Sequence, residues 1–428
     1  MKKFLSRIKL KFTILIPIVI TILTITFYFN FFELKTKLYN KYPNLALSKY
    51  IFKNIILTNN LNNDYNVKFL PYTQFVKMKL SKKKLIFKKE YYSSLQHSGS
   101  SISYSQWGTF FIETYKKKLL ISDFLGNIYY YDNLNNIINS SIKESKLNII
   151  KSNLTADRVF DIFFHDEKFY IAYTTEENNC KRINVSVAKF NQDLLIFNKL
   201  FAPKECNETG AIGRMQFYNH KGRPGILITT AEGTHDKPGK NAQNDKSVFG
   251  KTLFLDLNSH NYFIFSKGHR VIQGLYAEEN LILSSEHGPR GGDEINKIIL
   301  NANYGWPISS YGERYDFTYQ KNLYYKKNHE SLNFEEPIFA FVPSIGISEI
   351  LKLPNKFSSF FHNDLIITSL NDRSIYIANF DKDFSRIITI EKIFLGERIR
   401  DIKYYEELNS ILLAFEENGE IGILSVIK

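Results

Sequence analysis

The sequence predicts an all-β fold, a six-bladed β-propeller, preceded by an N-terminal transmembrane helix. Aromatic residues make up 15% of the chain, and such residues favour strands. Beyond about residue 66, short segments rich in β-branched and aromatic residues alternate with Asn, Asp and Gly turns. Before them, a long apolar run stands close to the N-terminus. These three observations together predict the fold class.

The expected strands recur at intervals along the rest of the chain. Roughly 360 residues of such units fit six four-stranded blades around an axis. A pair of β-sandwiches is the alternative, but residues 117–134 and 363–381 share one form, strand, polar turn and strand, as expected for the middle of a blade. The predicted strand segments are residues 117–134, 167–191, 224–233, 251–266, 279–288, 363–381 and 409–427.

The apolar run from Phe12 to Phe32 predicts an uncleaved membrane anchor. At about 1.5 Å per residue it spans a hydrocarbon core of about 30 Å, and no small-residue cleavage site follows it. The basic residues before the run favour a cytoplasmic N-terminus in the inner or plasma membrane. The C-terminal domain would then face the periplasm or the exterior. We expect a tail and single-pass anchor over residues 1–33, a stalk over 34–65 and a propeller over 66–428.

The formal net charge of +13 has two readings. It reflects either a compositional bias toward Lys and Asn or an attraction to an anionic surface or substrate. The Lys residues are scattered and form no basic stripe interleaved with aromatic residues. Nucleic acid is therefore not an expected partner.

Cys180 and Cys206 are the two cysteines of the chain. In an exported protein they form a natural disulfide pair, and the alternative is two inert thiols. Neither has the His or Cys neighbours that a zinc site requires.

A loop over residues 284–307 has an unusual composition, "SSEHGPRGGDEINKIILNANYGWP". The glycines permit positive φ and the proline fixes its own φ, so the loop can turn several carbonyl oxygens toward one point. Hard cations such as calcium take such oxygens, and Asp293 and Glu294 would supply charge beside them. A turn-rich connection between blades, with both acids facing solvent, is the alternative.

The assembled segment resembles the soluble quinoprotein sugar dehydrogenases, the glucose/sorbosone and aldose sugar dehydrogenases that use pyrroloquinoline quinone (PQQ). "EHGPRGGDEIN" followed by "NYGWP" carries the resemblance most specifically. Five further segments resemble family motifs and occur in the same order as in the family: "GRMQF", "NAQNDKSVFGKTLFLDL", "GHRVIQGL", "FVPSIGIS" and "ERIRDI". The resemblance covers roughly residues 157–428 and implies a six-bladed propeller.

The resemblance also implies a cofactor site on the propeller axis. PQQ would lie over a calcium ion held by the carbonyls of Gly288 and Pro289, and a second calcium would use Glu294 and Tyr304. The cofactor-binding residues would be Arg270, His287, Ser344, Arg398 and Arg400. Guanidinium groups suit the cofactor's carboxylates because they form paired hydrogen bonds with them.

The catalytic part of the family pattern is altered. The resemblance places a histidine, the general base that takes the sugar hydroxyl proton, at the position of Gly210. Glycine cannot accept a proton. His235 and His287 are the substitute candidates, and the family's Gln, Asn and Lys contacts are replaced by Ala156, Val271 and Asn371.

Three hypotheses follow for the function. The first is a PQQ-dependent dehydrogenase that oxidises aldose sugars and passes electrons to a quinone or a cytochrome. The second is a catalytically silent propeller that binds a ligand, a glycan or a protein. The third is a structural, membrane-anchored module, which does not account for the arginines at matching positions.

Overall fold

The computed structural model of the protein describes residues 66–67, 76, 78–88, 109–139, 144–178, 180–207, 209–233, 241–313 and 325–427. The chain divides into two units, residues 1–65 and 66–428. All described residues belong to the second unit, so the predicted anchor and stalk lie outside them. Within the described residues, no helix is long and apolar enough to cross a bilayer.

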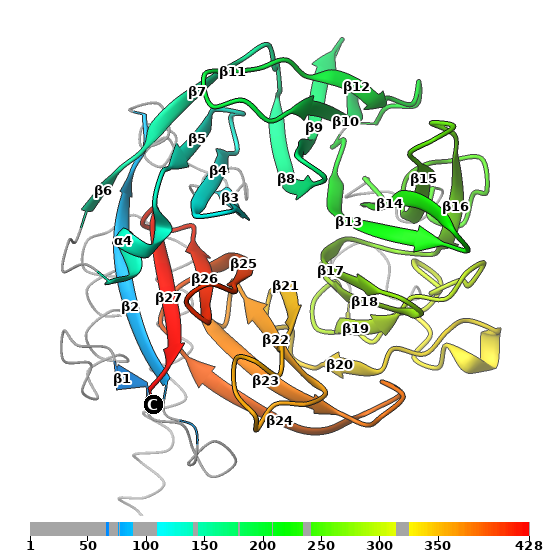
Figure 1. Cartoon of the computed structure of the whole chain (residues 1–428). Helices are drawn as coiled ribbons and strands as arrows, with labels where there is room; N and C mark the ends of the chain where they lie inside the picture. Colours follow the sequence, from blue (N-terminus) through cyan, green and yellow to red (C-terminus); the bar gives the residue numbers. More distant parts are fainter. Residues whose placement is uncertain are drawn as a thin grey trace, which may run out of the picture. The chain divides into compact units, whose positions relative to one another are not determined.

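Six antiparallel sheets form a ring within the second unit (Figure 1). Each sheet begins with a strand near the centre and continues outward through later strands, which is the architecture of a six-bladed β-propeller. The predicted all-β propeller is therefore confirmed, and each predicted strand segment contributes strands to a blade.

The first two blades, from the centre outward, consist of β3 (Phe110–Tyr115), β4 (Lys118–Asp123), β5 (Ile128–Tyr131) and β7 (Asn148–Ser152), then β8 (Arg158–His165), β9 (Lys168–Glu177), β10 (Cys180–Lys189) and β12 (Asn198–Phe201). The next two consist of β13 (Ile212–His220), β14 (Arg223–Thr230), β15 (Lys251–Asp256) and β16 (Tyr262–Lys267), then β17 (Ile272–Glu278), β18 (Leu281–Glu286), β19 (Asp293–Lys297) and β20 (Phe339–Phe341).

The last two blades consist of β21 (Ile347–Lys352), β22 (Asp364–Ser369), β23 (Ser374–Phe380) and β24 (Ile387–Phe394), then β25 (Ile399–Tyr405), β26 (Ser410–Phe415), β27 (Glu420–Val426) and β2 (Met78–Ile86). The smaller elements are β1 (Asn66–Val67), β6 (Glu144–Lys146), β11 (Leu194–Leu195), the short helix α4 (Leu134–Asn139) and the 3-10 turn η2 (Glu330–Leu332).

The second strands of the blades are buried on both faces because neighbouring blades cover them. Every residue of β22 and β26 is buried, and so is every residue of the third strand β15. This explains why these segments read as nearly continuous apolar runs rather than as alternating ones.

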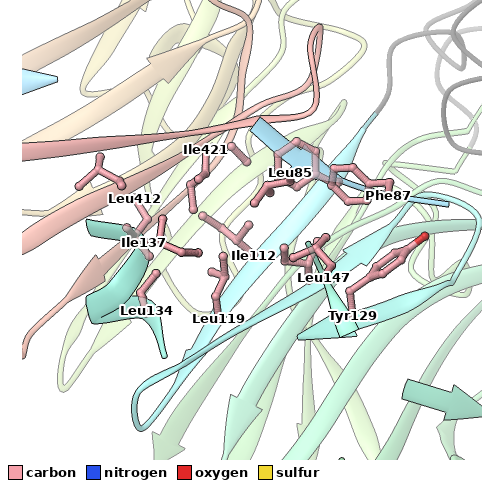
Figure 2. Packing of buried hydrophobic residues seen from close by; sticks show 14 of the residues in the cluster. Leu85, Phe87, Ile112, Leu119, Tyr129, Leu134, Ile137, Leu147, Leu412 and Ile421 are labelled. Carbon is pink, nitrogen blue, oxygen red and sulfur yellow. The ribbon is translucent and has the colours of Figure 1, made fainter. Parts of the chain in front are cut away.

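The ring closes through β2, which joins the last blade although it comes first in the sequence. β2 pairs antiparallel with β27, from Met78 opposite Val426 to Lys84 opposite Glu420. Behind this joint, Leu85 and Phe87 pack with residues of the first and last blades (Figure 2). The two ends of the unit are therefore held together by hydrogen bonds and by a shared apolar core.

Candidate active site

The predicted site residues lie where the innermost strands begin. Arg270 precedes β17, Ser344 precedes β21, and Arg398 and Arg400 stand at the start of β25. Hydrogen bonds join these starts: Arg400 Nη1 donates to Oε1 of Gln273 in β17 at 3.0 Å. We call this region the axial mouth, and it comprises Arg158, Gly210, Arg270, Ser344, Arg398 and Arg400.

Below the axial mouth lies a buried ion-pair network that joins several blades. Its central residue is Arg214 of β13, which pairs with Asp161 of β8 at 3.0 Å and with Glu349 of β21 at 2.7 Å. Asp401 of β25 lies 3.5 Å from the same guanidinium. We call Asp161, Arg214, Glu349 and Asp401 the axial network. It fixes the relative positions of the inner strands that carry the mouth.

Burial changes the protonation behaviour of this network. It raises the pKa of Asp161 to about 6, although Arg214 favours the charged form. The pKa of Glu349 rises to about 7 for the same reason. Desolvation therefore outweighs the attraction of one arginine shared among three carboxylates.

Arg398 and Arg400 share one buried carboxylate, that of Glu416. Their Nε atoms donate to its two oxygens at 2.9 and 2.7 Å. Burial works against the charge of Glu416, yet Arg400 and Arg398 hold its pKa below the usual value. This pairing fixes both guanidinium groups at the start of β25. Glu416 is thus a positioning carboxylate that the sequence did not predict.

The glycine-rich loop after β18 is compact. A Cβ atom at Gly288 would lie 2.0 Å from the carbonyl oxygen of Gly292, so a side chain has no room there. Asp293 holds the loop from within, since its carboxylate accepts from the backbone N–H groups of Gly288, Ile345 and Ile347 at 2.9 to 3.0 Å. These hydrogen bonds give Asp293 a structural role in the loop, and the charge that it would supply beside a cation stays a prediction.

The carbonyls predicted to hold calcium in this loop already accept hydrogen bonds. Arg270 Nη1 donates to the carbonyl oxygen of Gly288 at 3.0 Å and to that of His287 at 3.1 Å. Ser344 Oγ donates to that of Pro289 at 3.4 Å. A guanidinium cation thus stands at the Gly288 carbonyl, and a serine hydroxyl stands at the Pro289 carbonyl.

The second predicted calcium position has suitable chemistry. Glu294 is buried, and burial together with Glu286 raises its pKa well above the usual value. The Oδ1 atom of the neighbouring Asn296 is buried without a hydrogen-bond partner. A cavity of about 10 Å³ lies beside Glu286, Glu294 and Tyr304, and such a volume holds one water or ion.

The donor set at this second position is oxygen-rich and acidic, as calcium prefers. The Tyr304 hydroxyl donates to the Lys297 carbonyl and accepts from the Ile299 N–H, so only its own carbonyl remains for a metal. Over the described ranges, no three His, Cys, Asp or Glu side chains cluster as they would around a metal ion. The calcium sites therefore stay predictions.

Two histidines lie near the mouth and differ in their surroundings. His269 is engaged at both ring nitrogens, by Ser266 at 2.8 Å and by Glu286 at 3.0 Å. His287 Nε2 donates to the Ile347 carbonyl, which leaves Nδ1 as the nitrogen that can accept a proton. Burial, with help from Arg270 and Arg400, lowers the pKa of His287 and keeps it neutral.

Gly210 precedes β13 at the position where the resemblance expects a base. Its φ is 52°, and a Cβ atom there would lie 2.3 Å from Cβ of Lys181. Cys206, four residues earlier, forms a disulfide with Cys180. His235, the other substitute candidate, lies outside the described residues.

The sequence missed the axial network and Glu416, although several of their residues stand inside the quoted motifs. Arg214 belongs to "GRMQF" and Asp401 to "ERIRDI". Charged residues within the motifs of the inner strands were the available sign of a buried ion-pair network. Their partners are distant in sequence, as in the contact between Arg214 and the Arg400 carbonyl at 2.8 Å.

Comparison with known proteins agrees with this geometry. The model of a family described as glucose/sorbosone dehydrogenase matches residues 116–423, more than half of the chain. The chain belongs to this family. The match covers strands from all six sheets of the propeller.

Curated relatives align over shorter stretches. Aldose sugar dehydrogenase YliI of Escherichia coli is 30% identical over 164 residues, which cover 37% of this chain and 42% of the relative. Quinoprotein glucose dehydrogenase B of Acinetobacter calcoaceticus is 32% identical over 110 residues, 22% of each chain. The match thus spans less than half of the length of these relatives.

Solved structures show the same fold. The apo form of the soluble aldose sugar dehydrogenase of Escherichia coli superposes with a TM-score of 0.59, at 20% identity, over 75% of this chain and 96% of that one. The PQQ-bound aldose sugar dehydrogenase of Streptomyces coelicolor gives 0.52, at 16% identity, over 72% and 91%. Both likenesses concern the propeller itself.

Proposed function

We propose that the protein oxidises a hydroxyl group of an aldose sugar with PQQ bound at the axial mouth. The observation that carries the proposal is the meeting of arginines at this mouth, in a chain of the glucose/sorbosone dehydrogenase family. Arg270 donates to the carbonyls of His287 and Gly288, and Arg400 donates to Gln273 at the start of β17, so both guanidinium groups lie where β17 begins. An acidic, planar cofactor matches that charge.

The chain's own residues would bind and orient the cofactor. Arg270, Arg398 and Arg400 would hold the carboxylates of the cofactor, which when bound supplies the hydride acceptor. Gly210 offers no proton acceptor, whereas His287, whose backbone carbonyl accepts from Arg270, keeps Nδ1 as an acceptor because its Nε2 donates to the Ile347 carbonyl. Calcium would bind at Glu294, where the acidic charge is not balanced.

The proposal places the propeller outside the membrane. The apolar run from Phe12 to Phe32 would anchor the chain, and electrons would pass to a quinone or a cytochrome. Protease treatment of spheroplasts, which lack an outer barrier, before and after lysis tests this arrangement. Degradation of the propeller domain in unlysed spheroplasts is the expected result, and protection until lysis would contradict it.

The test of the activity uses the purified full-length chain with PQQ and calcium chloride. Cofactor binding is followed by absorbance and calorimetry, and activity by dye reduction with a panel of aldoses. We expect PQQ binding in the micromolar range or tighter, and its absence would overturn the proposal. Binding without dye reduction for any aldose would instead support the catalytically silent propeller.

A pair of variants separates binding from chemistry. Arg270→Gln should weaken PQQ binding because it removes a guanidinium from the mouth. At saturating PQQ, His287→Gln should lower dye reduction by about a hundredfold or more, the usual size of a lost general base. Equal activity of His287→Gln and the wild type would exclude His287 as the proton acceptor.

A further inference from the structure

Arg158 is a residue of the axial mouth that the resemblance does not include among its cofactor-binding arginines. It is the first residue of β8, and its guanidinium carbon lies 4.9 Å from the centroid of the Phe160 ring. This contact holds the flat group in one orientation. The side chain is therefore positioned rather than free in solvent.

The guanidinium of Arg158 forms no ion pair within the described residues, and Glu416 and Asp157 attract it only from beyond ion-pair distance. Its Nε atom is buried and has no hydrogen-bond partner. The adjacent acid, Asp157, is engaged by Lys181 at 2.8 Å and by Thr174 at 3.2 Å. Across the described part of the chain, no carboxylate lies within ion-pair distance of Arg158.

The surroundings add positive charge. Arg398 and Arg400 both pair with Glu416, so this carboxylate, which also attracts Arg158 from beyond ion-pair distance, is already engaged by two guanidinium groups. Burial and the charge of Arg400 lower the pKa of Arg158 to about 10. The side chain still carries its full charge at neutral pH.

A charged group in such a position is costly unless an anion joins it. Guanidinium groups match carboxylates and phosphates because two parallel N–H donors meet two oxygens. We propose that Arg158 and Arg400 form a binding site for one carboxylate or phosphate group of a small ligand at the axial mouth. A ligand of the axial mouth would therefore carry at least one acidic group.

The inference rests on the proposed function for the source of that group. It is either a carboxylate of the cofactor or the acidic group of the substrate, a sugar acid or a sugar phosphate. The binding experiments below involve no turnover. If no dehydrogenase activity is found, the anion-binding site can still be shown by these experiments. If no anion binding is found, the dehydrogenase activity is still tested by dye reduction.

The first experiment is calorimetry on the full-length chain without PQQ. Inorganic phosphate, D-glucuronate and glucose 6-phosphate are the anionic probes, and D-glucose is the neutral control. We expect at least one anion to bind and Arg158→Gln to weaken it about tenfold or more, the usual effect of a lost charged hydrogen bond. Arg158→Lys should retain part of the affinity.

Arg386→Gln is the matched control, because its side chain is 78% exposed and pairs only loosely with Asp381 at 3.7 Å. It removes the same charge without touching the mouth and should bind the anions as the wild type does. Equal loss in both variants would mean that net charge alone attracts the probe, which would overturn the proposal.

Thermal unfolding separates a ligand-binding arginine from a structural one. Without ligand, Arg158→Gln should be at least as stable as the wild type because it removes a partly buried charge that forms no ion pair. Added phosphate or D-glucuronate should raise the melting temperature of the wild type and not of the variant. A destabilised variant with unchanged anion binding would overturn the proposal.

PQQ titrations identify the source of the anion. Weaker PQQ binding in Arg158→Gln, with no binding of the sugar acid or sugar phosphate, assigns the site to the cofactor. Binding of an acidic sugar that depends on Arg158, with PQQ binding unchanged, assigns it to the substrate. If neither PQQ nor any anionic probe depends on Arg158, the proposal fails.

Discussion

Gly210 occupies a backbone position that excludes a side chain. Its positive φ disfavours any residue with a Cβ atom, and Cβ of Lys181 fills the adjoining space. The loss of a histidine here is therefore accompanied by a changed local backbone. Restoring the histidine alone would not restore a base in a catalytic position.

This leads to a stability prediction for Gly210→Ala. The variant should lose about 2–4 kcal/mol of unfolding free energy, from backbone strain and the contact with Lys181. Urea denaturation measures the loss. Gly222→Ala is the matched control, since its φ is 81° but nothing lies within 4 Å of the added Cβ. A loss at Gly210 no larger than at Gly222 would contradict the predicted clash.

The raised pKa of Glu349 predicts a pH dependence of stability. Its pKa is about 7 in the folded chain against an ordinary value of 4.5, so the folded state binds the proton more tightly. The stabilisation is complete below about pH 4.5 and is lost as the pH rises through 7. It amounts to the order of 3 kcal/mol.

Glu349→Gln should remove this contribution. Urea denaturation at pH 5 and pH 8 should show a smaller fall in stability between the two values for the variant than for the wild type. Glu279→Gln, at an exposed position, is the control and should keep the wild-type fall. A parallel fall in all three proteins would show that Glu349 does not titrate as described.

Individual site residues could be predicted only where a motif named them. Arg270, Arg398 and Arg400 were found because they stand in motif positions, and the structure brings them to one mouth. Glu416 and Asp161 were not, because their contacts join strands distant in sequence, such as β8 with β13. Arg158 lies outside the motifs that carried the family resemblance, and its contact with Phe160 in the same strand is not a signal that a sequence pattern shows.

At the scale of elements, the disulfide ties β10 to the loop before β13. Cys180 and Cys206 enclose a separation of 26 residues, and closing such a loop stabilises by about 3 kcal/mol in the chain-entropy description. The double variant Cys180→Ala, Cys206→Ala should lose a comparable unfolding free energy. Urea denaturation checks this.

Reduction provides the control for the disulfide prediction. Dithiothreitol should lower the midpoint of urea unfolding for the wild type to that of the double variant and should leave the double variant unchanged. An effect of the reductant on both proteins would point to a cause other than this bond.

The strands themselves were predictable because local chemistry determines them. Residues 363–381 became β22 and β23, and residues 409–427 became β26 and β27, as the apolar runs and polar turns indicated. β2 was not predicted, since its lysines resemble a solvated segment. Its strand character comes from pairing with β27, a partner more than 300 residues away that no local pattern reveals.

At the scale of the whole molecule, that pairing closes the ring. A propeller without closure would leave β27 as an open edge and expose the apolar joint between the first and last blades. Both ends of the unit must therefore be present before the final blade can form. The closing strand consequently holds the axial mouth in shape, because β25 with Arg398 and Arg400 belongs to the same blade.

Leu85→Ala tests the closure directly. Leu85 is fully buried in the joint, and its N–H donates to the Gly419 carbonyl at 3.0 Å. Loss of its side chain should cost about 2–5 kcal/mol of unfolding free energy, by lost burial and a cavity, and urea denaturation measures this. The adjacent Ile86→Ala is the control, since Ile86 is 41% exposed and its variant should stay within about 1 kcal/mol of the wild type. Equal effects of the two variants would mean that β2 does not close the ring in solution, and the unit would then unfold independently of its first strand.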